Sequence, residues 1–477
     1  MILRRFYDDK LAQASYLIGC AATGEALVVD ANRDVAQYLD AATSEGLRVT
    51  DVTETHIHAD YVSGSRELAR AAGARLWLSD EGGPDWRYGF AAAEGARLLH
   101  DGDTFKVGNI RIDVLHTPGH TPEHLSFLVT DTAGADRPMG ILTGDFVFVG
   151  AVGRPDLLEK AAGLEGTMEA GARDLFRSLQ RFRALPDWLQ VWPGHGAGSA
   201  CGKALGAVPQ TTVGYERLFN LALTIDSEDE FVDYILADQP EPPRYFAEMK
   251  RINRDGPRVL GGFARPPRLE AAALEELLAR GARIADLRPQ AEFEHGHVPG
   301  TISIPQNKSF TTWAGWLLPY DADFYLILPA GCESCIDEAV RDLAMIGRDR
   351  IAGYFAGEVV RAVPELERTP RVSASELAAQ LASGDVAIVD VRGAAEFAAG
   401  HLPGGRNIPL GYLEERLAAV PRDRPVVVHC QSGARSAIGA SLLLARGYRD
   451  VRNLAGGLDA WAAAGEPVER DGAPTPA

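Results

Sequence analysis

Histidine and aspartate side chains gather in four short segments of the first half of the chain, at residues 55–61, 116–120, 142–145 and 191–196. Histidine nitrogens and carboxylate oxygens are metal ligands, and each segment lies where an expected strand meets a loop. A lone histidine is usually a structural residue, whereas four such segments in order favour convergence at one edge of a sheet. The pattern predicts a metal site in this half of the chain.

A cysteine lies on a short loop near the end of the chain, between an apolar run at residues 426–428 and an apolar helical stretch at residues 438–445. The loop consists of Cys430, Gln431, Ser432, Gly433, Ala434 and Arg435. Such a cysteine faces backbone N–H groups and the positive end of the helix dipole, which stabilise a thiolate or a persulfide anion. Arg435 adds a positive charge that suits sulfite or thiosulfate. The pattern favours a sulfur-carrying nucleophile over an inert buried thiol.

Short strands and helices must position the metal-ligand segments. Strands are expected at residues 15–19, 26–30, 49–53 and 76–78, and helices near residues 35–42 and 64–72. Strand pairs interleaved with helices, with polar clusters at strand ends, indicate a layered α/β domain. We expect this domain to occupy residues 1–245.

The second half of the chain contains an internal repeat. Three blocks recur in order: residues 286–300 as 390–404, residues 326–329 as 426–429, and residues 355–357 as 455–457. This similarity predicts two copies of one α/β unit. We expect the copies at residues 255–366 and 370–470, followed by a frayed tail at residues 471–477.

Length and composition limit the classes of function. The chain has 477 residues, room for about three domains, and is 46% hydrophobic and 24% charged. A formal charge of −18 argues against nucleic acid or an anionic membrane as a main partner. The first residues lack the apolar core of a secretory signal, and no apolar run is long enough to span a bilayer. We therefore expect a cytoplasmic protein.

The four metal-ligand segments resemble those of the metallo-β-lactamase superfamily over roughly residues 10–245, where the first segment usually reads His-x-His-x-Asp-His. The resemblance implies that His56, His58 and His120 match the histidines of the first metal in two-metal members. It also implies that Asp145 matches the carboxylate that bridges the two metals.

The same resemblance assigns Asp60 and His195 to the second metal, but one position departs from the pattern. Tyr61 stands where the superfamily has another histidine of that metal. A phenol, whose ordinary pKa is about 10, is a poor zinc ligand at neutral pH. We therefore expect a single metal ion.

Residues 143–157 and 193–199 look like the persulfide dioxygenase branch of the superfamily. This implies one Fe(II) per chain, held by His56, His120 and Asp145. Two histidines and one carboxylate leave open positions for O₂ and a persulfide sulfur. The groups expected around the ligands or the substrate are His58, Asp60, Tyr61, His195, Arg154 and Cys201. The competing interpretation is a zinc thioester hydrolase of the glyoxalase II kind.

The cysteine loop is similar to that of an active rhodanese over about residues 370–468, with supporting motifs at residues 390–392 and 400–404. The resemblance implies that Cys430 and Arg435 are catalytic and that the loop backbone holds the persulfide. Related phosphatases have one more residue between cysteine and arginine, so this spacing favours sulfur over phosphate. In the first copy, alanine occupies the position of the nucleophile, and we expect that copy to be inactive.

The remaining thiols have simpler expected roles. Five cysteines in a chain of this size indicate reduced thiols rather than a disulfide framework. Cys332 and Cys335 lack a second pair for zinc and are expected to be idle thiols, and Cys20 is expected in the core. Cys201 follows His195 by six residues in a glycine-rich loop and either packs in the core or faces the metal pocket.

Together these patterns predict an α/β protein, with an αββα metallo-β-lactamase sandwich followed by two α/β rhodanese-like domains. We expect iron-dependent oxidation of a low-molecular-weight thiol persulfide to sulfite by O₂, coupled to rhodanese sulfur transfer between persulfide and sulfite or thiosulfate. A homo-oligomer is expected. The alternatives are a zinc hydrolase fused to a sulfurtransferase and a non-catalytic sulfur-trafficking scaffold.

Overall fold

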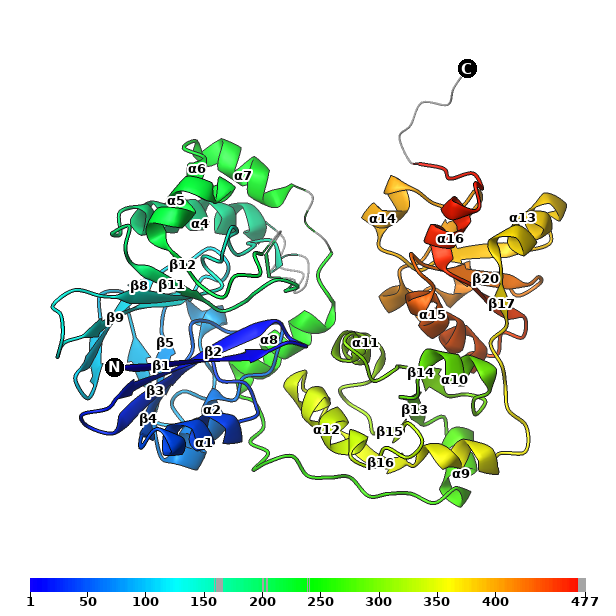
Figure 1. Ribbon diagram of the computed structural model, residues 1–477, viewed down its shortest axis with the longest axis horizontal. Helices are drawn as coiled ribbons and strands as arrows, with labels where there is room; N and C mark the ends of the chain where they lie inside the picture. The colour runs from blue at the N-terminus through cyan, green and yellow to red at the C-terminus, as the bar shows by residue number, and fades with distance from the viewer. Residues whose placement is uncertain are drawn as a thin grey trace. The chain divides into compact units, whose positions relative to one another are not determined.

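The computed structural model describes residues 1–157, 159, 166–199, 201–202, 205–237, 239 and 241–470. The chain divides into two structural units (Figure 1). The first comprises Met1–Phe263 with Ala344–Gly347, and the second comprises Ala264–Leu343 with Arg348–Ala477. The tail predicted at residues 471–477 lies outside the described residues.

Two six-stranded sheets form the centre of the first unit (Figure 1). The first sheet contains, in spatial order, β1 (Ile2–Asp8), β2 (Gln13–Cys20), β3 (Glu25–Val29), β4 (Arg48–Thr53), β5 (Arg75–Ser79) and β6 (Arg97–Leu99). The second contains β12 (Thr211–Thr212), β11 (Gln190–Pro193), β10 (Gly140–Gly144), β9 (Leu125–Asp131), β8 (Ile110–His116) and β7 (Thr104–Val107).

The inner faces of the two sheets share one hydrophobic core. On β8, alternate residues are buried, among them Ile110, Ile112 and Val114, because successive side chains of a strand point to opposite faces. These residues belong to the same buried cluster as Tyr16 and Ile18 of β2. The sheets therefore pack face to face.

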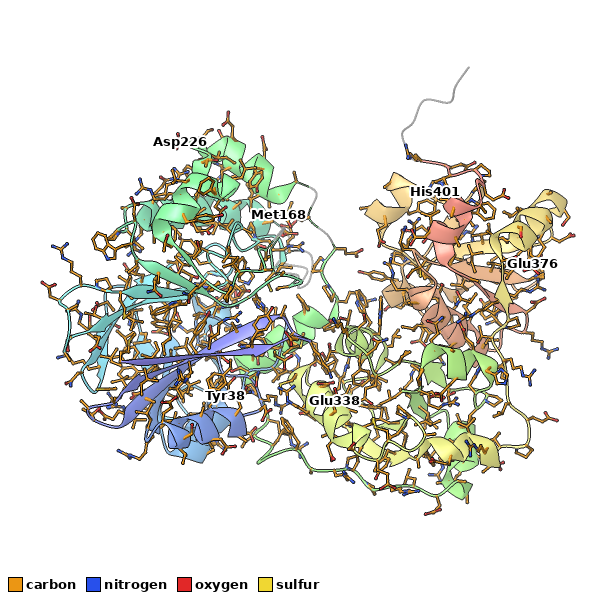
Figure 2. The ribbon with its side chains drawn as sticks, in the orientation of Figure 1. Tyr38, Met168, Asp226, Glu338, Glu376 and His401 are labelled. Carbon is orange, nitrogen blue, oxygen red and sulfur yellow. A yellow bond between two sulfur atoms is a disulfide. The ribbon has the colours of Figure 1, made fainter. Side chains whose placement is uncertain are left out.

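Helices cover both outer faces, so the first unit is an αββα sandwich. The first sheet packs its outer side chains against α1 (Ala36–Ser44) and α2 (Ser65–Ala72). Tyr38 of α1, labelled in Figure 2, is fully buried in this cluster. The second packs against α4 (Thr167–Arg183) and α7 (Glu228–Leu236). The other helices are η1 (Pro84–Trp86), α5 (Val213–Phe219), α6 (Leu221–Thr224) and α8 (Tyr245–Asp255). The αββα sandwich predicted for this part of the chain is confirmed.

The second unit contains two parallel sheets. One has the order β14 (Ile302–Ser303), β13 (Arg283–Asp286), β15 (Phe324–Ile327) and β16 (Ile351–Phe355). The other has the order β19 (Arg406–Asn407), β18 (Ala387–Asp390), β20 (Val426–His429), β21 (Val451–Leu454) and β17 (Arg371–Val372). The strands β14, β13, β15 and β16 correspond in order to β19, β18, β20 and β21, so the structure confirms the internal repeat.

Helices complete each copy of the repeat. The first copy has α9 (Ala272–Ala279), α10 (Gln290–His295), α11 (Phe310–Leu317), α12 (Cys335–Met345) and η2 (Gly357–Ala362). The second has α13 (Ala374–Ser383), α14 (Ala394–Ala399), η3 (Leu410–Tyr412), η4 (Leu417–Ala419), α15 (Ala434–Ala445) and α16 (Gly457–Ala463). Within the part of the chain that the structure describes, every helix is too short or too polar to cross a bilayer.

Candidate functional site

Three buried side chains converge at the carboxyl ends of strands in the first unit. His56 follows β4, His120 follows β8 and Asp145 follows β10. Their ligand atoms all lie within 4.8 Å of one another. Asp145 Oδ2 is 3.5 Å from His120 Nε2 and 3.9 Å from His56 Nε2. The structure thus brings together the three residues that the sequence assigned to one metal.

Hydrogen bonds orient both histidine rings. His120 Nδ1 lies 3.1 Å from the carbonyl oxygen of Arg154 and donates to it. His56 Nδ1 donates to Thr55 Oγ1 over 2.9 Å, because that hydroxyl gives its own proton to Asp30. Each ring therefore has its Nε2 free of a proton and directed toward Asp145. Such second bonds are the usual support of metal-binding histidines.

The polar atoms at the centre of this group fit a bound metal. Among the described residues, neither oxygen of Asp145 nor Nε2 of His56 has a hydrogen-bond partner. A buried carboxylate whose oxygens accept no hydrogen bond is costly, and a divalent cation would supply the missing interaction. Burial also lowers the pKa of His56 well below its ordinary value, which keeps the ring in the neutral form that binds metals. Two nitrogens and one carboxylate suit Fe(II) or Zn(II).

Two glycines allow the loops to close around Asp145. A Cβ atom on Gly153 would lie 1.8 Å from the Asp145 carbonyl oxygen, and one on Gly194 would lie 2.8 Å from Oδ1. Only glycine permits so close an approach of the backbone. These contacts explain why glycine occupies position 153, after the third segment, and position 194 in the fourth segment.

A second buried group lies beside the first. The ligand atoms of Asp60, His195 and Cys201 are within 4.8 Å of one another. His195 Nε2 is 3.0 Å from Asp60 Oδ2 and 3.4 Å from Asp145 Oδ1. Although burial opposes the shift, these carboxylates raise the pKa of His195 well above its ordinary value. Cys201 is buried, and its sulfur lies beside Asp60 and His195.

Asp30 is a site residue that the sequence did not single out. Its carboxylate accepts hydrogen bonds from the Thr55 backbone and hydroxyl, and it lies 3.2 Å from His58 Nε2. Burial alone would lower the pKa of His58, but Asp30 raises it to about 9. The Tyr61 hydroxyl donates to the Asp30 carbonyl oxygen over 3.2 Å. His58 and Tyr61 are thus hydrogen-bonded to Asp30.

The Arg154 side chain, expected near the ligands or the substrate, is paired with Asp156. Its guanidinium forms a two-pronged ion pair with the buried Asp156, with bonds of 2.8 and 2.6 Å. Arg154 contacts the candidate ligands through its backbone carbonyl, which accepts from His120. Its structural contribution is therefore to hold the loop and orient a ligand.

Asn253 on α8 is a further residue that sequence reasoning missed. It is 1% exposed, and its amide donates to the carbonyl oxygens of His58 at 2.8 Å and Tyr61 at 2.7 Å. Its Oδ1 accepts from the Ser63 backbone at 2.9 Å. One side chain thus fixes two backbone groups of the first metal-ligand segment and a third just after it. No pattern near residue 253 identifies this role.

We predict that Asn253→Ala destabilises the first unit and weakens metal binding. Three buried backbone groups lose their partner, so the free energy of unfolding should fall by roughly 3 kcal/mol. Asn220→Ala is the matched control, because Asn220 is equally buried but bonds Ala151 and Glu216 away from the metal-ligand segments. Denaturant unfolding measures the stability of both variants. Elemental analysis should show metal loss in Asn253→Ala and none in Asn220→Ala. Equal metal contents would contradict the assigned role.

The cysteine loop in the second unit follows β20 and leads into α15. Cys430 is 1% exposed, and its Sγ accepts from the Gly433 backbone at 3.2 Å. The Ser436 hydroxyl lies 3.5 Å from the same sulfur. The loop donates toward Cys430 Sγ at the amino end of a helix, which suits an anionic sulfur.

Side chains around the loop hold it and supply charge. The Arg435 guanidinium bonds both Glu396 carboxylate oxygens at 2.7 Å, which raises the pKa of the arginine. The Gln431 amide oxygen accepts a hydrogen bond from the Arg392 guanidinium at 3.1 Å. An incoming oxyanion must compete with Glu396 for Arg435.

The corresponding loop of the first copy differs in chemistry. Ala330 follows β15, and the Gly331 backbone donates to the Glu358 carboxylate at 3.0 Å. Cys332 and Cys335 form a disulfide, with Cα atoms 5.4 Å apart. The prediction of five reduced thiols is therefore wrong for this pair, because the turn into α12 brings positions three residues apart within bonding distance.

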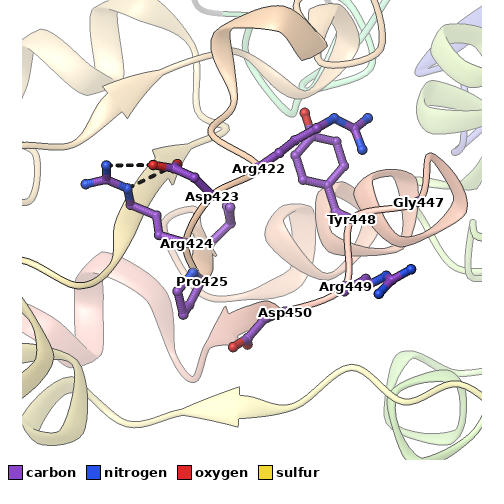
Figure 3. A pocket seen from close by; sticks show the side chains of 9 residues that line it. Arg422, Asp423, Arg424, Pro425, Gly447, Tyr448, Arg449 and Asp450 are labelled. Atoms are coloured by element: carbon purple, nitrogen blue, oxygen red, sulfur yellow. Dashed lines mark hydrogen bonds and ion pairs between the residues drawn. The ribbon is translucent and has the colours of Figure 1, made fainter.

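A cavity of about 480 Å³ in the second copy is not the cysteine site (Figure 3). It is lined by residues including Asp423, Arg424 and Tyr448, and it opens at the amino end of β20, near Val426. Cys430 follows the carboxyl end of that strand. The two features lie at opposite ends of β20.

Comparison with known families agrees with this division. Residues 8–195 match the metallo-beta-lactamase superfamily, and residues 270–345 and 373–464 each match the rhodanese-like domain. The chain is similar to a solved structure described as a metallo-beta-lactamase from Staphylococcus aureus. That similarity has 42% identity and a TM-score of 0.67, and it covers 75% of this chain and 99% of the other.

Individual relatives divide between activities. A sulfurtransferase of Allochromatium vinosum is 43% identical over 84 residues, covering 18% of this chain and 78% of the relative. The mitochondrial persulfide dioxygenase ETHE1 of Bos taurus is 27% identical, covering 49% and 79%. A hydroxyacylglutathione hydrolase of Rhodopseudomonas palustris strain BisA53 is 33% identical, covering 41% and 67%. Enzymes named for oxidation and for hydrolysis are thus both similar to this chain.

Proposed function

Because the chain belongs to the metallo-β-lactamase superfamily and carries tandem rhodanese domains, we propose that it oxidises a low-molecular-weight thiol persulfide and transfers sulfane sulfur. The first reaction is RSSH + O₂ + H₂O → RSH + SO₃²⁻ + 2 H⁺. The second moves one sulfur atom between a persulfide and sulfite or thiosulfate.

The buried group of His56, His120 and Asp145 carries the proposal for the first reaction. The group contains two histidines and one carboxylate. His58 is not part of it, because its Nε2 lies 3.2 Å from Asp30 Oδ1. A third histidine on the same metal would suit a two-zinc hydrolase. The arrangement therefore supports one Fe(II) with several open coordination positions.

Bound Fe(II) would supply adjacent positions for O₂ and the persulfide sulfur, and the protein holds these groups in place. Thr55 and the Arg154 carbonyl fix the rings of His56 and His120. The ligand side chains are at most 3% exposed, which limits the access of bulk water. His195 places a positive charge beside Asp60 and Asp145.

Cys430 carries the proposal for the second reaction. Its thiolate attacks the outer sulfur of thiosulfate, the S–S bond breaks, and sulfite leaves with the electron pair. The Gly433 N–H and the dipole of α15 stabilise the resulting Cys430 persulfide. Arg435 would bind the departing oxyanion. Sulfite from the first site is an acceptor for the reverse transfer, so the product of one domain is a substrate of the other.

A zinc thioester hydrolase is the second candidate. One argument for it is the similarity to the hydroxyacylglutathione hydrolase. The other is that Asp60 and Cys201 place a carboxylate and a thiol close to His195, where a second metal could bind.

A side-by-side assay distinguishes the two candidates. The purified chain should consume O₂ and form sulfite with glutathione persulfide, and it should leave S-lactoylglutathione intact. Thioester hydrolysis without O₂ uptake would refute the oxidation.

Tyr61 provides a further prediction, because we propose that it closes the second metal position. The phenol is fully buried and hydrogen-bonded to the Asp30 carbonyl. Tyr61→His adds an imidazole near Asp60 and His195 and should raise the zinc content after reconstitution with iron and zinc in competition. Tyr61→Phe, which keeps the ring and removes the hydroxyl, should retain the wild-type metal. Unchanged iron selectivity in Tyr61→His would contradict the proposal.

A further inference from the structure

The first copy of the repeat contains a disulfide where the second copy contains its reactive loop. Cys332 lies between β15 and α12 and Cys335 begins α12, at the place that corresponds to residues 430–435. Both residues are partly exposed, whereas Cys20, Cys201 and Cys430 are buried free thiols. The pair is thus open to a reactant from solution.

The two sulfur atoms have different surroundings. Cys332 lines a cavity of about 570 Å³ together with Arg268, Gly331 and Tyr354. Cys335 is the first residue of α12, and its carbonyl oxygen accepts from Gln306. A reactant in the cavity therefore reaches Cys332, and a thiolate released on Cys335 would be stabilised by the amino end of an eleven-residue helix.

The charges in the cavity favour a small reactant with little charge. Arg268 pairs with Glu333 at 2.7 Å, and Glu358 accepts from the Gly331 backbone at 3.0 Å. The residues that line the cavity carry one positive and two negative charges, so the lining disfavours divalent sulfite and thiosulfate. Hydrosulfide carries one negative charge and is in equilibrium with neutral hydrogen sulfide.

We propose that the Cys332–Cys335 disulfide captures inorganic sulfide as a persulfide on Cys332. Hydrosulfide attacks Cys332 Sγ, the bond between the two cysteines breaks, and its electron pair leaves on Cys335 as a thiolate. Two electrons pass from sulfide to the disulfide, which is the oxidant, so the step needs no other reagent. Attack of the Cys335 thiolate on Cys332 reverses the step and releases hydrosulfide. The first copy thereby binds sulfane sulfur without a residue equivalent to Cys430.

Mass spectrometry of the full-length chain tests this proposal independently of both enzymatic reactions. The protein is treated with diamide to close the pair, desalted without O₂, incubated with sodium sulfide, and alkylated in denaturant. We expect one added hydrogen sulfide per chain, located as an alkylated persulfide on Cys332. Incubation with thiosulfate in place of sulfide should leave the pair unchanged.

Two variants are the controls. Cys335→Ser leaves Cys332 without the disulfide and should take up no sulfide, whereas Cys430→Ser should take up as much as the wild type. Failure of the pair to close, or a closed pair that gains no sulfur, would overturn the proposal. Equal uptake by Cys335→Ser would overturn it too, because the disulfide could not then be the oxidant.

Discussion

Replacing Asp145 by alanine is expected to remove the bound metal and with it persulfide-dependent O₂ uptake. Asp145 supplies the carboxylate of the proposed ligand set and lies at the centre of the buried group. Loss of a residue that merely orients a ligand costs about 10- to 100-fold in metal affinity, so loss of a ligand should cost at least about 100-fold. Elemental analysis and an oxygen electrode measure the two effects.

The second unit provides the control for this variant. Asp145 belongs to the first unit and Cys430 to the second, so thiosulfate sulfurtransferase activity should persist in Asp145→Ala. His120→Ala should behave in the same way, because it removes a nitrogen ligand. Wild-type metal content in either variant would show that the metal binds elsewhere.

Replacing Cys430 by serine is expected to abolish sulfur exchange and leave O₂ uptake largely unchanged. A hydroxyl preserves the shape of the loop but neither carries sulfane sulfur nor ionises near neutral pH. The rate of thiocyanate formation from thiosulfate and cyanide should fall at least about a thousandfold.

Cys20→Ser is the matched variant, since Cys20 is a buried thiol of the first unit outside both candidate sites. It should retain both activities. Loss of O₂ uptake together with sulfur exchange in Cys430→Ser would contradict two separate reactions and indicate that the sites act as one.

The layers of the fold and the presence of a buried histidine and aspartate cluster could be predicted because they leave local patterns, whereas the choice of His56, His120 and Asp145 came from the resemblance to the superfamily. Alternating apolar residues such as Ile110, Ile112 and Val114 mark a half-buried strand. The expectation of a single sheet edge was wrong, because the ligand side chains meet across the two packed sheets. His56 follows β4 of the first sheet, whereas His120 and Asp145 follow β8 and β10 of the second. The repeat was visible because both copies keep the same pairs, such as Asp286 with Arg288 and Asp390 with Arg392.

Residues that support the site through long-range contacts left no such pattern. Asn253 bonds groups about 190 residues earlier in the chain, and a single asparagine on a helix is common. Asp30 ends a strand like many other aspartates, and its role appears only when β3 lies beside β4. The position of Cys201 and the pairing of Cys332 with Cys335 depended on loop conformation, which spacing does not determine.

The metal content of the freshly purified full-length chain tests the central claim most directly. A single site built from His56, His120 and Asp145 predicts about one iron per chain and little zinc. Two tightly bound zinc ions per chain, with thioester hydrolysis and no O₂ uptake, would contradict the persulfide dioxygenase account.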